Sequence, residues 1–153
     1  MALERQATRL RGTFPQPTPI HHDYASLPIQ DGFDWARSLR SIPALRLYLV
    51  VFRSKRRVSA DLRVLKEHDD AAYAEALGAG GLLHYFKGEV NEQRECLSFC
   101  LWESRQHALE AIGGPSHRAA AEIWRKMYES YELERYHLQK SGEETITFER
   151  LPA

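Results

Sequence analysis

The order of hydrophobic periodicities from residue 45 onward constrains the fold of this 153-residue chain more than any other feature. Runs of apolar, β-branched and aromatic residues predict strands, and apolar residues at three- and four-residue spacing predict amphipathic helices. The pattern predicts strands at residues 45–53, 82–88, 95–102 and 131–139, and helices at residues 60–77, 105–112 and from 116 onward. This order is βαββαβ with an interrupted second helix, which predicts an α+β domain of the ferredoxin-like class with an antiparallel four-stranded sheet and its helices on one face.

The predicted strand at residues 95–102 has two distinct faces. Because side chains alternate across a strand, Cys96, Ser98, Cys100 and Trp102 share one face, and the other face is apolar. Two cysteines four residues apart on one strand are about 13 Å from each other, which is too far for a disulfide. We therefore expect reduced thiols and a cytoplasmic protein.

A sheet of this kind is covered by helices on only one face. The predicted strands are apolar on both faces, so the second face also needs a cover. A second copy of the chain is the simplest cover, and we expect a homodimer, or a higher assembly, in which two sheets pair into a dimeric α+β barrel.

Residues 1–44 differ in composition from the rest of the chain. They hold five of the seven prolines, which disfavour long helices and central strands. They also hold aromatic residues, which disordered tails lack. We expect an N-terminal arm anchored by Phe33 and Trp35 on the domain or its partner; a mobile leader ordered only near Trp35 is the alternative. The predicted organisation is an arm at 1–44, a domain at 45–139 and a tail at 140–153.

Charge and hydropathy exclude several kinds of partner. The formal net charge is zero, which removes the electrostatic basis for binding nucleic acid or an anionic membrane. No apolar run approaches the roughly 20 residues that span a bilayer, and the polar N-terminus does not resemble a secretion signal. A small apolar or aromatic ligand is the expected partner besides a second copy of the chain.

Serine residues mark the expected starts of the helices. Ser59, Ser104 and Ser116 precede the predicted helices and are the expected N-caps.

The charged residues of the first helix do not indicate a metal site. Asp69 is the one polar residue in the apolar stripe of this helix. It is adjacent to His68 and Asp70, but adjacent helical residues point in different directions, so we interpret this group as a solvated helix face.

Three motifs carry a resemblance to a known family. They are Trp102-Glu103-Ser104, Pro115-Ser116-His117-Arg118-Ala119-Ala120, and Ser130-Tyr131 followed by Tyr136. Together they resemble the antibiotic-biosynthesis monooxygenase superfamily, in residues 45–139. The resemblance implies a dimeric α+β barrel and a cofactor-independent monooxygenase that acts on a small aromatic or flat apolar molecule. The implied reaction is deprotonation of an activated phenol or enol, followed by direct reaction with oxygen, with neither cofactor nor metal.

Haem-degrading members of that superfamily have a different residue pattern. They use an Asn on the first strand, a Trp in the second helix and a His on the next helix. The last two positions correspond to Ala111 and Ala121 here, and residues 45–52 contain no Asn. Haem degradation is therefore disfavoured, although His117 could ligate haem from another position.

Two histidines are the candidate bases. An imidazole is suited to this role because small shifts move its pKa across neutrality. His84 is expected on the same strand face as Leu82 and Phe86, where a hydrogen bond in a dimer interface is the alternative role. His117 lies in the first turn of a helix, where capping or packing is the alternative. The side chains expected to line the substrate cavity are Trp102, Tyr85, Trp124 and Tyr73; a position in the hydrophobic core is the alternative for each of them.

A function of a different class remains open. The chain could be a non-catalytic dimeric module that binds a small ligand or has a structural role. A deep cavity that contains an imidazole favours the enzyme, and a cavity filled by side chains favours the module.

Overall fold

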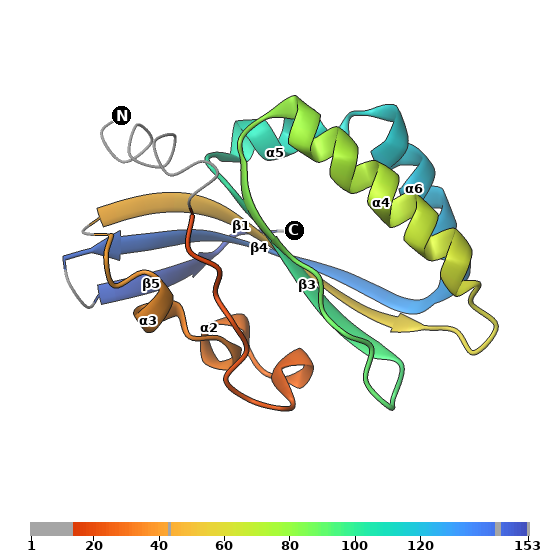
Figure 1. The fold of residues 1–153 in the computed structure, drawn as a ribbon, viewed down its shortest axis with the longest axis horizontal. Helices are drawn as coiled ribbons and strands as arrows, with labels where there is room; N and C mark the ends of the chain where they lie inside the picture. The colour runs from red at the N-terminus through yellow and green to blue at the C-terminus, as the bar shows by residue number, and fades with distance from the viewer. Residues whose placement is uncertain (1–13, 43, 143–144, 153) are drawn as a thin grey trace.

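The computed structural model describes residues 14–42, 44–142 and 145–152. A five-stranded antiparallel sheet in the order β2-β3-β1-β4-β5 forms its centre. Helices α4, α5 and α6 cover one face, and the segment before β1 covers part of the other (Figure 1). The elements are η1 (Tyr24–Ser26), α2 (Ile29–Gly32), α3 (Trp35–Ser38), β1 (Ala44–Arg56), α4 (Leu62–Ala79), β2 (Leu82–Phe86), β3 (Glu95–Trp102), α5 (Arg105–Ile112), α6 (Pro115–Met127), β4 (Tyr128–Ser141) and β5 (Thr145–Arg150).

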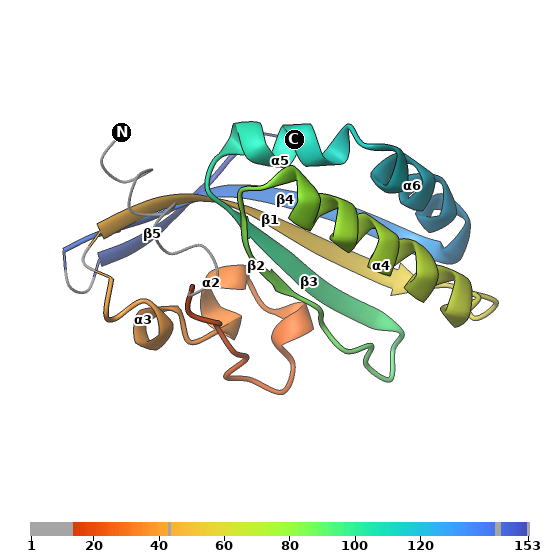
Figure 2. The same ribbon diagram turned by 45° about the horizontal axis from the view of Figure 1, so that its top comes forward.

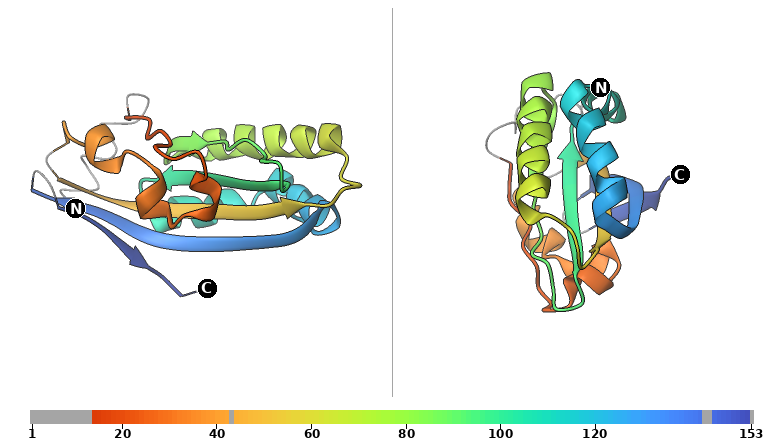
Figure 3. Two further views of the ribbon diagram at one scale, coloured as in Figure 1. Left: turned by 90° about the horizontal axis from the view of Figure 1, so that it is seen from below. Right: turned by 90° about the vertical axis from the view of Figure 1, so that its right-hand side faces the viewer.

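The predicted α+β ferredoxin-like class is confirmed, with one more strand than expected. β1 pairs with both β3 and β4, and β2 extends the sheet beyond β3. The additional strand is β5, which pairs with β4 along residues 136–141 and lies at the edge of the sheet (Figure 3). It comes from the segment predicted as a C-terminal tail.

The two faces of β3 are those predicted from its alternation. Leu97, Phe99 and Leu101 are fully buried in the larger hydrophobic core, on the sheet face away from α4, α5 and α6. The opposite face of β3 points toward the helices. Local alternation was sufficient here because β3 pairs with β1 along its whole length and with β2 along residues 99–102.

The segment of residues 14–42, called the arm below, packs against the sheet face away from α4, α5 and α6 (Figure 2). Phe33 and Trp35 are each 3% exposed and contact the ring of Phe99, at 5.1 and 5.3 Å between centroids. Their predicted burial is therefore confirmed. The first part of the predicted arm, residues 1–13, lies outside the described residues.

Hydrogen bonds also hold the arm in place. Lys140 on β4 is 1% exposed, and its Nζ donates to the carbonyl oxygens of Leu39 and Ile42, both at 2.6 Å. Arg53 on β1 donates to the carbonyl oxygens of Ala25 and Leu27, at 2.9 and 2.8 Å. The arm is thus bonded to two central strands by cationic side chains.

This arrangement changes the physical argument for a dimer. A second copy was expected on the bare apolar face of the sheet, but the arm of the same chain covers apolar side chains of β1, β3 and β4 there. Self-association stays a prediction, and it no longer follows from a bare sheet face.

The helix caps differ from the predictions at two of three positions. Ser104 caps α5 as predicted, and its Oγ accepts from the backbone N–H of His107 at 3.3 Å. α4 begins two residues later than predicted because Asp61, not Ser59, is its N-cap, with Oδ1 accepting from the N–H groups of Arg63 and Val64.

Within the described ranges, none of the helices combines the length and the apolar character needed to cross a membrane.

Candidate functional site

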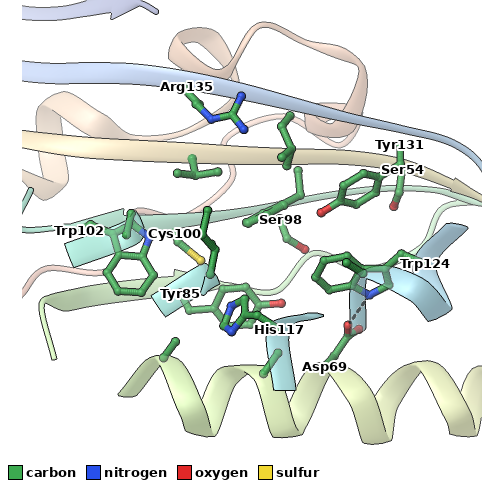
Figure 4. Close-up of a pocket in the computed structure, with 18 of the residues that line it drawn as sticks. Ser54, Asp69, Tyr85, Ser98, Cys100, Trp102, His117, Trp124, Tyr131 and Arg135 are labelled. Atoms are coloured by element: carbon green, nitrogen blue, oxygen red, sulfur yellow. Dashed lines mark hydrogen bonds between the residues drawn. The ribbon is translucent and has the colours of Figure 1, made fainter. Parts of the chain in front are cut away.

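A cavity of about 1060 Å³ lies between the helices and the sheet (Figure 4). Side chains of β1, β2, β3 and β4 form its floor, and α4, α5 and α6 form its roof. Ligand pockets in proteins are typically about 300–1,000 Å³. The volume is therefore sufficient for a molecule with several fused rings.

The strand register arranges the floor in rows across the sheet. In one row Tyr85 is paired with Cys100, Cys100 with Val50, and Val50 with Arg135. The neighbouring row contains Trp102, beside Tyr48 and His137. The rows on the other side contain Ser98 and then Cys96, each on β3. Adjacent rows differ by two residues along a strand, so the four rows extend over roughly 20 Å.

Three aromatic rings form a stack at one end of the cavity. The ring of Trp124 lies 5.4 Å from that of Tyr131, with 22° between the planes, and Tyr131 lies 5.7 Å from Tyr128, with 9° between the planes. Burial raises the pKa of Tyr128 to about 12 and also raises the pKa of Tyr131 and of Tyr85. At neutral pH these phenols are protonated and can donate hydrogen bonds to a ligand.

The two cysteines on the cavity floor have low nucleophilic character. Both are free thiols. Burial raises the pKa of Cys96 and, more strongly, that of Cys100. Since the thiolate is the nucleophile, these residues contribute small polarizable surface to the cavity and no reactive sulfur at neutral pH.

Asp69 of α4 lies at the aromatic end of the cavity and was interpreted from the sequence as part of a solvated face. Its Oδ1 accepts a hydrogen bond from Nε1 of Trp124 at 3.0 Å. Burial raises the pKa of Asp69, and the hydrogen bond from Trp124 opposes this shift. The signal that could have identified it is its position as the one polar residue in the apolar stripe of α4.

His117 lies in the first turn of α6 and lines the cavity (Figure 4). Its Nδ1 is 3.2 Å from Oε1 of Glu75 on α4. If Nδ1 carries the proton and donates it to Glu75, Nε2 is left as a hydrogen-bond acceptor. The pair is therefore arranged as an imidazole oriented by a carboxylate, which is a geometry suited to a general base.

Glu75 also caps α6, a role that was assigned to Ser116. The carboxylate accepts from the backbone N–H of Ser116 at 2.9 Å and from that of His117 at 3.0 Å. The hydrogen bond from Ser116 is the main cause that lowers the pKa of Glu75 to about 2, and those from His117 add to it. The helix is thus capped by a side chain from a different helix, which the local sequence does not reveal.

The other candidate base, His84, does not line the cavity. A β-bulge between Leu82 and His84 shifts the register of β2 against β3. Leu82 therefore faces the helices, whereas His84 faces the opposite side with Phe86 and lies 5.8 Å from the ring of Phe99. The prediction that His84 shares a face with Leu82 is wrong, because strict alternation fails at a bulge.

Acidification is expected to destabilise the protein partly through His84. Its Nε2 is buried and has no hydrogen-bond partner in the described structure, and burial lowers the pKa of His84. The unfolded chain binds the proton more readily, so this contribution to stability is complete above about pH 6.5 and is lost as the pH falls below it. His84→Phe should reduce the fall in Tm between pH 7.5 and 5.5.

The exposed residue His21 provides a matched control for this experiment. His21→Gln should not reproduce the effect of His84→Phe. His137, whose pKa is lowered by burial and by Arg46 and Arg105, should account for part of the dependence that remains. An unaltered pH dependence in His84→Phe would contradict the expectation.

The four aromatic residues predicted to line a cavity all do so. Trp102, Tyr85 and Trp124 lie along its length, and the ring of Tyr73, which is 41% exposed, lies 5.1 Å from that of Tyr85, with the two planes tilted by 33°. Within the described part of the chain, no group of three or more His, Cys, Asp or Glu residues is placed to hold a metal ion. The arrangement is a large aromatic cavity with one oriented imidazole, that of His117, and one half-buried carboxylate, that of Asp69.

Solved structures with this fold include three that are informative. SnoaB from Streptomyces nogalater, in a mutant form described as a cofactor-independent oxygenase, is 11% identical, with a TM-score of 0.51 over 58% of this chain and 89% of that chain. Rv0793 from Mycobacterium tuberculosis is 19% identical, with a TM-score of 0.52 over 58% and 91%. SO0527 from Shewanella oneidensis is 12% identical, with a TM-score of 0.54 over 63% and 94%.

These similarities confirm the fold that the resemblance to the antibiotic-biosynthesis monooxygenase superfamily implied. No curated protein matches the chain. A family model described as PB2B2.08-like matches residues 1–150, which include the arm and the fifth strand as well as the ferredoxin-like part. The chain therefore belongs to the PB2B2.08-like family.

Proposed function

We propose that the protein is a cofactor-independent oxygenase that acts on a flat aromatic molecule bound in the cavity. The observation that carries the proposal is the His117–Glu75 pair, at 3.2 Å, on the wall of a large cavity lined by aromatic side chains. The description of SnoaB as a cofactor-independent oxygenase of the same fold supports it.

The proposed reaction needs only a base and molecular oxygen. Nε2 of His117 removes a proton from an acidified C–H group of a phenolic or enolic substrate, and the electron pair stays on the substrate as a carbanion. Oxygen accepts electrons from the carbanion and forms a C–O bond, and the resulting peroxide takes the proton back from His117. Loss of water then gives a carbonyl group. In sum, a CH₂ group and O₂ yield C=O and H₂O.

The remaining side chains have roles that match this step. Glu75 holds the imidazole in one tautomer and stabilises the imidazolium that forms. The protonated phenols of Tyr85 and Tyr131 can donate hydrogen bonds to the oxyanion that develops on the substrate. The aromatic walls orient a flat molecule and exclude water, which favours reaction of the carbanion with oxygen over reprotonation.

Replacement of His117 by alanine is expected to lower oxygen uptake with an activated phenol, such as an anthrone, by about 10²-fold or more, the usual contribution of a positioned base. Uptake is measured with an oxygen electrode on purified protein whose Tm has been checked. His84→Ala is the matched control, because it removes a histidine from the other face of the sheet, and it should retain activity. Glu75→Gln keeps an acceptor for the N-terminus of α6, and its activity should lie between those of the wild type and His117→Ala.

Other results would favour the non-catalytic alternative. Equal oxygen uptake in His117→Ala, His84→Ala and the wild type would remove histidine from the mechanism. Binding of the aromatic molecule without any oxygen uptake would indicate a ligand-binding module.

The compartment and the assembly state are part of the same proposal. Two free thiols that share one strand face suit a reducing compartment such as the cytoplasm. If the protein forms a homodimer with the arm in place, the dimer must use a surface other than the part of the sheet that the arm covers.

A further inference from the structure

The charged residues around the cavity are strongly unbalanced. Six lysine and arginine residues of the described chain line it, against one acidic residue, although the whole sequence has 21 residues of each charge type. The lining cations are Arg56, Lys87, Arg105, Arg118, Arg125 and Arg135. A cavity with this balance attracts anionic molecules, because its low-dielectric walls concentrate the positive potential.

The six cations differ in depth. Lys87, Arg105, Arg118 and Arg125 are exposed, so solvent screens their charges. Arg56 is half-buried near Asp69, and its charge lowers the pKa of that carboxyl group. Arg135 is also half-buried, but it lies on the floor, in the row of Val50 and Cys100.

Arg135 makes no ion pair with any described residue. Within the same part of the chain no side-chain hydrogen bond involves its guanidinium, whereas Arg53, on the opposite face of the sheet, is paired with Glu134 on the adjacent strand. A guanidinium that is partly removed from water without a partner is unfavourable, and it binds an incoming anion more strongly than a fully hydrated cation does. Its planar fork matches the two oxygens of a carboxylate.

We infer that the ligand of this cavity is an aromatic acid whose carboxylate binds Arg135. The inference deepens the proposed function by naming the class of substrate, and it rests on that function only for the position of the reacting group. The ring system extends from Arg135 toward the Trp124–Tyr131 stack. Tyr131 and Arg135 are four residues apart on β4, about 13 Å in a strand. This span suits a molecule of two or three fused rings.

The test compares two ligands of nearly the same shape, an anionic carboxylate and its neutral amide. Binding of 2-naphthoate and of 2-naphthamide to the full chain is measured by isothermal titration calorimetry. The wild type should bind the carboxylate about tenfold more tightly or better, as expected for a charge-assisted bidentate pair. Arg135→Gln should remove most of this preference and leave the affinity for the amide within about twofold.

Arg118→Gln is the matched control, because it removes the same charge from an exposed position on the cavity rim. It should keep the preference for the carboxylate. Equal affinity of the wild type for the two ligands, or no binding of either, would overturn the inference, as would a preference that Arg118→Gln abolishes and Arg135→Gln retains.

The inference and the proposed function can fail separately. The same titrations in His117→Ala should show an intact preference for 2-naphthoate, because His117 does not contact the anion. If the wild type prefers the carboxylate but takes up no oxygen with aromatic acids or anthrones, the anion site stands and the oxygenase proposal is overturned.

Discussion

Replacement of Trp35 by alanine is expected to lower the free energy of unfolding by about 3–5 kcal/mol, the range for large aromatic truncations in packed cores. Trp35 is 3% exposed, and its ring lies 5.3 Å from that of Phe99 and 5.4 Å from that of Phe148. Its Nε1 donates to the carbonyl oxygen of Ile29 at 2.9 Å. The substitution therefore removes a core ring and leaves a carbonyl oxygen without its donor.

Urea denaturation followed by circular dichroism measures this effect. Trp124→Ala is the control, because Trp124 is a tryptophan of the cavity wall and is only half-buried. It should cost clearly less than Trp35→Ala. An unchanged unfolding midpoint in Trp35→Ala would mean that the arm is not docked in solution.

Lys140→Met should lower the free energy of unfolding by about 2–4 kcal/mol, since each buried carbonyl left without a donor costs about 1–3 kcal/mol. Methionine has a similar unbranched shape but cannot donate to Leu39 and Ile42, whose carbonyl oxygens are each 2.6 Å from Nζ. The arm should become more accessible to hydrogen exchange near these two residues.

Lys126→Met is the matched control, because Lys126 is exposed on α6. It should leave stability within about 0.5 kcal/mol of the wild type, as surface substitutions do. If Lys140→Met is equally stable, water satisfies the two carbonyls and Lys140 does not hold the arm.

The parts of the fold that were predicted from the sequence depend on local patterns. The bounds of β3 and α5 agree with the prediction, because unbroken alternation defines the strand and Ser104 defines the helix start. The burial of Phe33 and Trp35 could also be predicted, because exposing several aromatic side chains of one segment to water is unfavourable.

The parts that were missed depend on contacts between distant residues. The bulge that turns His84 away from the cavity is a property of the β2–β3 pairing. The cap of α6 comes from Glu75, which is 41 residues from Ser116. β5 was missed although residues 145–148, Thr-Ile-Thr-Phe, have β propensity, because a short edge strand is identified by its partner β4.

The sequence was sufficient to predict part of the cavity lining. His117 and the aromatic residues Trp102, Tyr85, Trp124 and Tyr73 all lie around one cavity, and their roles in binding and catalysis stay predictions. Two features of the cavity follow from tertiary packing and have no signature in the sequence. They are the pairing of His117 with Glu75 and, among the described residues, the lack of an ion pair at Arg135.

The position of Lys140 has a consequence for biosynthesis. The ammonium group that fixes Leu39 is made 101 residues after it, so the arm leaves the ribosome long before its binding surface exists. Domains generally fold as units and contacts of long sequence separation form slowly, so the earliest-made aromatic residues are among the last to dock. Between the synthesis of the arm and that of β4, Phe33 and Trp35 are exposed apolar side chains. We expect a chaperone to find its largest apolar binding surface on the chain in this period.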